Sequence, residues 1–200
     1  WYFVNVGESG KVTLQIADVT GHGLSAALIG SMSKLALSAA GREVPHELLG
    51  QMNRLMSPQL PAGRFVTVSS CLYDPASGEI DFARAGHPPG FVLHRATGTV
   101  EQLKGSGFPL GFIPDGEYSH EKSKLEVGDV LMLITDGISE ASNRSNELYG
   151  FDRLSAALAA SKPEAGVAHI IETVLSDFDR FRDERMLKDD VTIVALKRLK

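Results

Sequence analysis

The sequence predicts an α+β fold, in which antiparallel sheets are covered by pairs of helices. Segments with strand periodicity follow one another through short turns rich in glycine, proline and serine, which is typical of hairpins. Segments with helical periodicity come in consecutive pairs and do not alternate with single strands. A parallel βαβ sheet is therefore disfavoured.

The strands are predicted from alternating or continuous apolar residues between turns. Residues 1–6 and 11–17 flank a Gly-Glu-Ser-Gly turn and form the first hairpin. Further strands are predicted at residues 65–73, 79–85, 91–94, 100–103, 118–125, 130–135 and 191–196. In the first hairpin, residues pair so that their numbers sum to about 18. Asp18 then faces the position just before Trp1.

Helices are predicted where apolar residues recur every three or four positions. They span residues 24–40, 45–56, 151–160 and 164–182. The first ends at Gly41, and the second has Pro45 in its first turn, where a missing N–H costs nothing.

Length and composition predict one globular domain over residues 1–200. Hydrophobic residues make up 43% and charged residues 22% of the 200 residues. The net charge of −5 disfavours nucleic acid as a partner, because no basic field faces a phosphate backbone. Cys71 is the single cysteine and lies in an apolar run, so we expect a buried free thiol and no internal disulfide.

The sequence gives no sign of a membrane-bound or exported domain. The longest uninterrupted apolar run, residues 130–134, is far shorter than the ~20 residues that span a bilayer. No signal-peptide pattern is present, so a cytoplasmic location without membrane contact is expected. The sequence opens at Trp1 within a predicted strand and without methionine, which predicts a truncated start and a longer, multidomain protein.

Aspartates stand at the ends of several apolar strands. Asp18 follows the strand at 11–17, Asp136 follows the strand at 130–135, and Asp189 and Asp190 precede the last strand. A carboxylate beside a buried strand is costly unless it meets a cation or several donors. If the last two strands pair antiparallel, Asp136 and Asp189 converge, and such oxygen-rich sites favour Mg²⁺ or Mn²⁺. Ordinary turn aspartates remain an equally open interpretation.

Seven motifs together resemble a known family. They are DVTGHGLSAA at 18–27, AGHPP at 85–89, GFPLG at 107–111, LEVGDVL at 125–131, TDGISEA at 135–141, ELYG at 147–150 and DDVT at 189–192. In this order they resemble the bacterial type-2C (PPM) serine/threonine protein phosphatases, in the SpoIIE-like branch that controls sporulation and sigma-factor partner switching. The resemblance covers residues 1 to about 198.

The resemblance implies a fold, a metal centre and a reaction. The fold is an αββα sandwich, and two Mn²⁺ or Mg²⁺ ions share a water that attacks phosphoserine or phosphothreonine. The ligands that it implies are the Asp18 carboxylate as the bridging ligand, the Val19 carbonyl, and the carboxylates of Asp136 and Asp189. Candidates beside these ligands are Gly21, His22, Gly137 and Asp190.

The resemblance also implies partners and shows one departure. The implied substrate is a phosphorylated bacterial regulator such as an anti-sigma-factor antagonist, and an upstream receiver or sensor domain is expected. Relatives carry Gly-Gly-Asp before an aromatic pair, and that aspartate is a metal ligand. Here Trp1-Tyr2 is the aromatic pair, so the expected ligand falls just before Trp1.

Other interpretations stay open at this point. The domain is alternatively a catalytically silent phosphatase-like module that binds a partner, or a different two-metal hydrolase such as a nuclease, which the acidic surface disfavours. His22 either shapes the turn between two glycines or binds phosphate or metal. His87 is either a structural residue at a strand end or a proton donor to the leaving serine.

Overall fold

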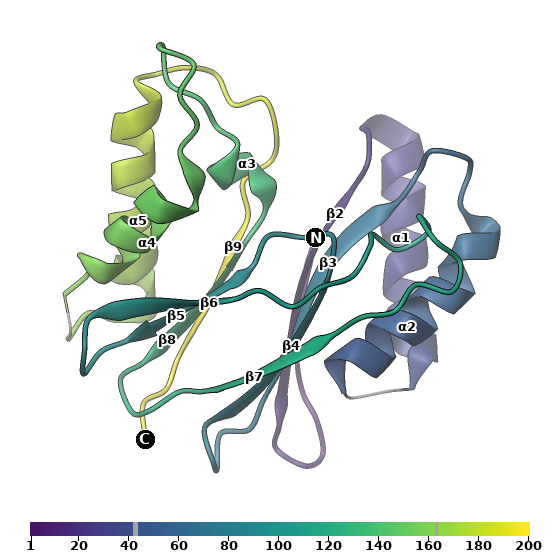
Figure 1. Cartoon of the computed structure of the whole chain (residues 1–200), viewed down its shortest axis with the longest axis horizontal. Helices are drawn as coiled ribbons and strands as arrows, with labels where there is room; N and C mark the ends of the chain where they lie inside the picture. The colour runs from purple at the N-terminus through teal and green to yellow at the C-terminus, as the bar shows by residue number, and fades with distance from the viewer. Residues whose placement is uncertain (42–43, 163) are drawn as a thin grey trace. The chain divides into compact units, whose positions relative to one another are not determined.

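The computed structural model describes residues 1–41, 44–162 and 164–200 (Figure 1). The chain divides into two compact units, and it passes between them three times. The first unit comprises Trp1–Pro89 and Leu103–Lys124, and the second comprises Gly90–Gln102 and Leu125–Lys200. One domain is expected over residues 1–200 from the sequence, and each of the two units has its own core.

A five-stranded antiparallel sheet forms the base of the first unit. Its strand order is β1-β2-β3-β4-β7. The strands are β1 (Tyr2–Val6), β2 (Val12–Val19), β3 (Val66–Tyr73), β4 (Glu79–Ala85) and β7 (His120–Lys124). Tyr2 pairs with Ile16, and Trp1 exchanges backbone hydrogen bonds with Ala17. The predicted hairpin register is thus confirmed, and Asp18 is the next residue along β2.

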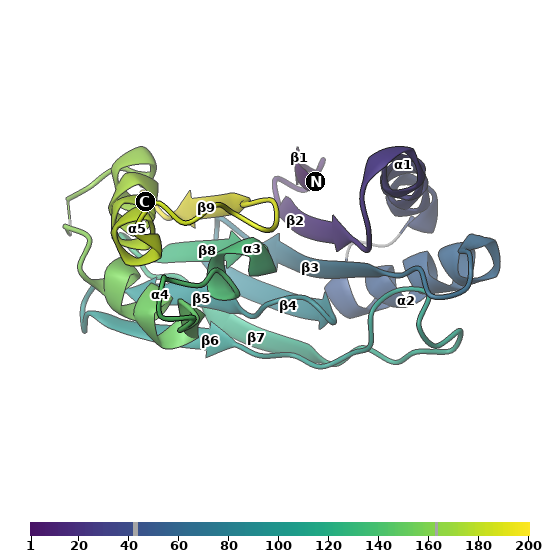
Figure 2. The same cartoon turned by 90° about the horizontal axis from the view of Figure 1, so that it is seen from above.

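Two helices pack beside this sheet, α1 (Gly23–Ala40) and α2 (Pro45–Met56), followed by the 3₁₀ turn η1 (Ser57–Gln59). Figure 2 shows both helices on the same side of this sheet. The inner face of α2 packs with strands β2, β3 and β4 and with helix α1 in one core, which includes Leu48, Leu49, Met52, Met56, Val66, Val68 and Leu110. Burial of this apolar stripe holds α2 in place.

Helix α1 is apolar along its whole length. Its 18 residues have a mean hydropathy of 1.3, so by length and composition alone it is apolar enough to cross a membrane. The sequence prediction missed this window because serines and glycines interrupt its apolar runs. Leu24 and Leu35 are more than two-thirds exposed, whereas Ile29 and Ala36 are buried in the core of the first unit. A core helix of a water-soluble domain has the same composition, so this feature is weak evidence for a membrane.

The second unit contains a four-stranded antiparallel sheet in the order β6-β5-β8-β9. Its elements are β5 (Gly90–His94), β6 (Thr99–Leu103), β8 (Val130–Ile134), α3 (Asp136–Ser139), α4 (Gly150–Ala159), α5 (Val167–Arg182) and β9 (Ile193–Lys197). Every residue of β8 is buried. Helices α4 and α5 cover the sheet, and Figure 1 shows them side by side. Phe178 of α5 and Leu154 of α4 belong to the same core as Met132 of β8.

The predicted elements are confirmed, with shifts at their ends. Helix α5 begins at Val167, three residues later than predicted, because Gly166 is still extended at its N-cap. Helix α3, a single turn after β8, was not predicted because four residues are too few to show helical periodicity. Cys71 is buried as expected, and burial raises the pKa of its thiol far above the ordinary value.

The His94 side chain on β5 contacts carboxylates from two other parts of the second unit, β6 and the turn before β8. Its Nδ1 lies 3.2 Å from the buried Asp129 carboxylate and its Nε2 lies 3.0 Å from Glu101 of β6. Partial burial by itself would lower the pKa of His94, but its hydrogen bonds to Glu101 and Asp129 outweigh this and raise it. The charged imidazolium therefore stabilises the fold.

Replacing His94 with glutamine is expected to destabilise the protein by about 1 kcal/mol in acid and by less in alkali. A histidine whose pKa is raised by folding stabilises fully below its unfolded pKa of about 6.5, and this contribution fades as the pH rises through the folded value. Urea unfolding of parent and variant below pH 6 and above pH 8 measures the difference. His169→Gln, at an exposed position, is the control. An equal loss of stability at both pH values would show that the charge of His94 does not stabilise the fold.

Candidate metal centre

Asp136 stands where the buried strand β8 ends and helix α3 begins. Thr135 is the N-cap of α3 and is buried, and Asp136 is the first helical residue. β8 and β9 pair antiparallel with Ile134 opposite Ile193, so the segment that leads into β9 runs back beside Asp136. This is the arrangement on which the predicted convergence of Asp136 and Asp189 depended.

The carboxylates of Asp136 and Asp189 converge as predicted. Their oxygens lie within 4.8 Å of one another. Asp136 is half-buried, and its Oδ1 has no hydrogen-bond partner among the described residues. Burial raises the pKa of Asp136, and the negative charges of Asp189 and Glu140 raise it further. Two acidic groups that repel each other and leave an oxygen unsatisfied fit a hard divalent cation.

Hydrogen bonds from side chains to the backbone fix the segment that carries Asp189. The hydroxyl of Thr135 donates to the Asp190 carbonyl at 3.0 Å and accepts the N–H of Thr192 at 2.9 Å. Asp189 Oδ1 accepts the N–H of Asp190 at 2.8 Å. Gly137 lies directly against this segment: a Cβ there would overlap the Asp190 carbonyl oxygen and come within 3.0 Å of its carbon. The close approach requires glycine.

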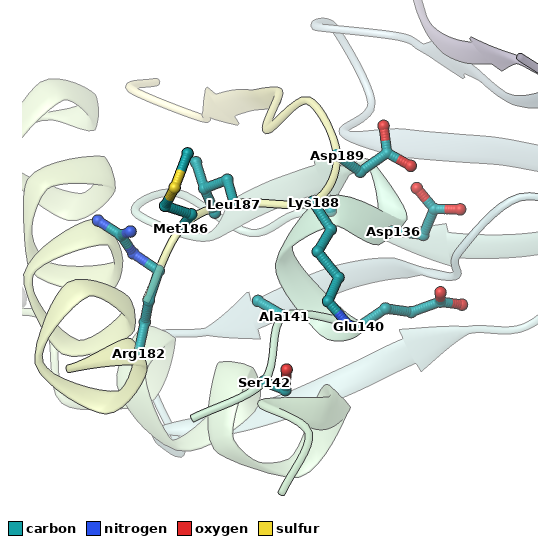
Figure 3. A pocket seen from close by; sticks show the side chains of 10 residues that line it. Asp136, Glu140, Ala141, Ser142, Arg182, Met186, Leu187, Lys188 and Asp189 are labelled. Carbon is teal, nitrogen blue, oxygen red and sulfur yellow. The ribbon is translucent and has the colours of Figure 1, made fainter. Parts of the chain in front are cut away.

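A pocket in the second unit opens onto the two carboxylates (Figure 3). The Asp136 and Asp189 side chains point toward one another, and Glu140 projects on the same side. Lys188 runs along the pocket wall toward Glu140, while Arg182 and Met186 lie on the opposite wall. The pocket thus combines acidic groups that can hold a cation with basic groups that can attract an anion. The side chain of Asp190 does not line it.

Asp18 and Val19 are the last two residues of β2 in the first unit. Asp18 is half-buried, lies opposite Thr67 of β3, and accepts the Val19 N–H through Oδ1 at 2.9 Å. The structure therefore brings together two of the predicted ligands, Asp136 and Asp189, within one unit. The place of Asp18 beside them is a proposal, because Asp18 belongs to the other unit.

The loop after Asp18 has the conformation that its glycines permit. Gly21 and Gly23 have φ of +89° and +77°, and His22 between them is the extended N-cap of α1. The His22 side chain makes no cap hydrogen bond, which leaves its two interpretations open. Arg64 donates to the Thr20 carbonyl at 3.1 Å and packs against Gly21 where a Cβ would stand. The positively charged guanidinium of Arg64 therefore lies against this loop.

His87 is placed as a structural residue. It is 1% exposed, and its Nδ1 lies 2.8 Å from the Thr67 hydroxyl. The proton-donor interpretation has no geometric support from this buried position.

The sequence is similar to a known protein family. Residues 8–199 match the family described as stage II sporulation protein E (SpoIIE). The chain belongs to the SpoIIE family. Over 98% of its length it is 30% identical to phosphoserine phosphatase RsbU of Bacillus subtilis, and the match covers 58% of that protein. The chain thus spans little more than half of this curated relative.

Solved structures show the fold of this SpoIIE-family chain. The SiaA-PP2C domain of Pseudomonas aeruginosa matches 98% of the chain and 79% of its own with a TM-score of 0.85 at 22% identity. The RsbU and RsbW domains of Rv1364c from Mycobacterium tuberculosis match all of the chain and 55% of their own, with a TM-score of 0.78 at 27% identity. A catalytic domain of the phosphatase PstP, solved with two manganese ions, matches all of the chain and 91% of its own with a TM-score of 0.67 at 15% identity. The predicted α+β fold class is confirmed.

Sequence reasoning missed several residues that shape the SpoIIE-family site. Lys188 directly precedes Asp189, but no motif spacing singled it out. Thr135 was included only as part of a motif, and its two hydrogen bonds become visible only when β8 and β9 pair. Arg64 is 46 residues from Asp18 in sequence, and no local pattern connects it to the loop that it contacts.

Proposed function

We propose that this chain is a metal-dependent protein serine/threonine phosphatase, with Asp18, Asp136 and Asp189 as its catalytic metal ligands. The observation that carries the proposal is the converging pair Asp136 and Asp189, with a buried oxygen left unsatisfied. Membership of the SpoIIE family, and a relative named as a phosphoserine phosphatase, support the reaction. A silent binding module has no need for unneutralised carboxylates in a pocket.

Mn²⁺ or Mg²⁺ is the proposed cofactor, with two ions expected. The donors are carboxylates and a backbone carbonyl, Val19, and such hard oxygen ligands suit these ions. A related fold was solved with two manganese ions. When bound, such ions lower the pKa of water and offset negative charge on phosphoryl oxygens.

The chain's own residues have distinct proposed tasks. Asp136 and Asp189 supply negative charge at one point, which Thr135 and Gly137 keep fixed by holding the segment of residues 189–192. Lys188 supplies positive charge at the same pocket, and Arg64 supplies it on the loop after Asp18. These cations are proposed to attract and orient the anionic phosphoryl group.

The substrate and setting are also proposals. We infer a phosphorylated regulator of the anti-sigma-factor antagonist kind, because the relatives include phosphoserine phosphatases RsbU and RsbP and a structure that joins RsbU and RsbW domains. A cytoplasmic location suits such a partner. An upstream receiver or sensor domain is also proposed; the match covers 58% of RsbU, so that relative contains further sequence.

The proposal predicts phosphatase activity that depends on a divalent cation. The test uses the chain extended upstream of Trp1. Hydrolysis of a phosphoserine peptide should appear with Mn²⁺, disappear on chelation and return when the ion is restored. A phosphotyrosine peptide is the control for substrate class. Inactivity with both Mn²⁺ and Mg²⁺, together with intact partner binding, would instead support the silent module.

A further inference from the structure

Two histidines and an aspartate meet in the first unit, away from the residues assigned to the phosphatase reaction. They are His46 in the first turn of α2, Asp81 on β4 and His120 at the start of β7. One potential ligand atom from each lies within 4.8 Å of the others. The imidazole centroids are 4.5 Å apart, and His120 Nδ1 is 3.4 Å from Asp81 Oδ1. Three separate elements therefore direct donor atoms to one point.

The sheet register explains this meeting. β4 and β7 pair antiparallel with Ala83 opposite His120, and Asp81 is two residues from Ala83. Directly opposite residues share a face, as do residues two apart, so Asp81 and His120 are on the face that carries Ala83. Ala83 is packed in the core with Leu49 of α2, three residues after His46 on the same side of the helix. His46 is thereby turned toward the two sheet residues.

Two polar atoms in this cluster are unsatisfied. His46 Nδ1 and Asp81 Oδ1 are buried, and neither has a hydrogen-bond partner among the described residues. The contact between Asp81 Oδ1 and His120 Nδ1, at 3.4 Å, is longer than a good hydrogen bond. A buried donor or acceptor without a partner is costly, and both of these costs disappear if one ligand binds all three side chains.

We propose that His46, Asp81 and His120 form a Zn²⁺ site that joins α2 to β4 and β7. Two imidazoles and one carboxylate are a borderline-soft donor set, which favours Zn²⁺ over the hard Mg²⁺ and Mn²⁺. Zn²⁺ ligands in tetrahedral geometry stand about 3.3 Å apart, so only side-chain adjustment is needed from the observed spacing. His120 is 45% exposed, which leaves a route for the ion and a fourth position for water. The site is independent of the proposed phosphatase centre.

The test measures metal binding, with no need for activity. Untagged chain titrated with Zn²⁺ in a calorimeter should bind one equivalent through this site. Co²⁺ in its place should give the visible absorption bands of a tetrahedral ion with nitrogen ligands. His46→Ala and His120→Ala should each weaken binding by at least about tenfold. His169→Ala, which removes an exposed histidine of α5, should leave binding unchanged.

Two further variants separate this proposal from the phosphatase function and from misfolding. Asp136→Asn should keep the Zn²⁺ affinity of the parent, because Asp136 is not part of this cluster. Asp81→Asn keeps the side-chain shape and should also weaken binding, with circular dichroism showing an unchanged fold. Parent-like Zn²⁺ affinity in both histidine variants, or the absence of tetrahedral Co²⁺ bands in the parent, would overturn the proposal.

Discussion

Asp136→Asn is expected to lower metal-dependent phosphatase activity by at least about 100-fold while making the metal-free protein more stable. The half-buried carboxylate of Asp136 faces the negative charges of Asp189 and Glu140, and burial itself already raises its pKa. Asparagine keeps the shape and removes the charge, so the repulsion is relieved. The same change removes the oxygen charge that holds a divalent cation.

Two measurements check that Asp136→Asn loses activity and gains stability. Phosphoserine hydrolysis at saturating Mn²⁺ reports the loss of activity, and thermal unfolding in chelator reports the gain in melting temperature. The gain in melting temperature should vanish when Mn²⁺ is added, because the parent binds the ion more tightly than the variant and is stabilised more by it. Asp152→Asn, at an exposed site in the first turn of α4, is the charge-matched control and should keep activity. Full activity in Asp136→Asn would remove Asp136 from the metal centre.

Gly137→Ala is expected to reduce activity about 10- to 100-fold and to cost about 1–3 kcal/mol of stability. The added methyl group would overlap the Asp190 carbonyl, which Thr135 holds through a hydrogen bond. Because the obstruction is backbone, the segment that carries Asp189 must move. Asp189 then leaves its position beside Asp136, and the geometry of the cation site changes.

The matched control is Gly166→Ala, since a Cβ at that position meets no atom within 4 Å among the described residues beyond its two chain neighbours. Gly166 is the N-cap of α5, so this variant is expected to lose at most about 1 kcal/mol and to keep its activity. Urea unfolding and phosphoserine hydrolysis are compared for both variants. If Gly137→Ala keeps the Mn²⁺ affinity and turnover of the parent, the close packing at Asp190 does not position the site.

The sequence predicted much of the fold because the signals involved are local. The glycine-rich turn and the alternation around it set the register of the first hairpin, and Tyr2 pairs with Ile16 as the numbers require. Aspartates at strand ends indicated that Asp136 and Asp189 would meet only if the last two strands paired antiparallel, and the structure shows this pairing. The ends of helices and strands were predicted less accurately. Helix α5 begins after the extended N-cap Gly166, and apolar periodicity does not distinguish such a cap residue from the first helical residues.

The amino-acid sequence by itself determined the α+β class, the paired helices and the acidic residues at strand ends, since turn chemistry and apolar spacing act between near neighbours. Only the tertiary structure decided which residues far apart in the sequence lie close together in space. The packing of Gly137 against Asp190, the contact of Arg64 with the Thr20 carbonyl, and the meeting of His46, Asp81 and His120 all depend on register and helix placement. No short stretch of sequence predicts these contacts, because they depend on how the helices and strands pack when the whole core is buried.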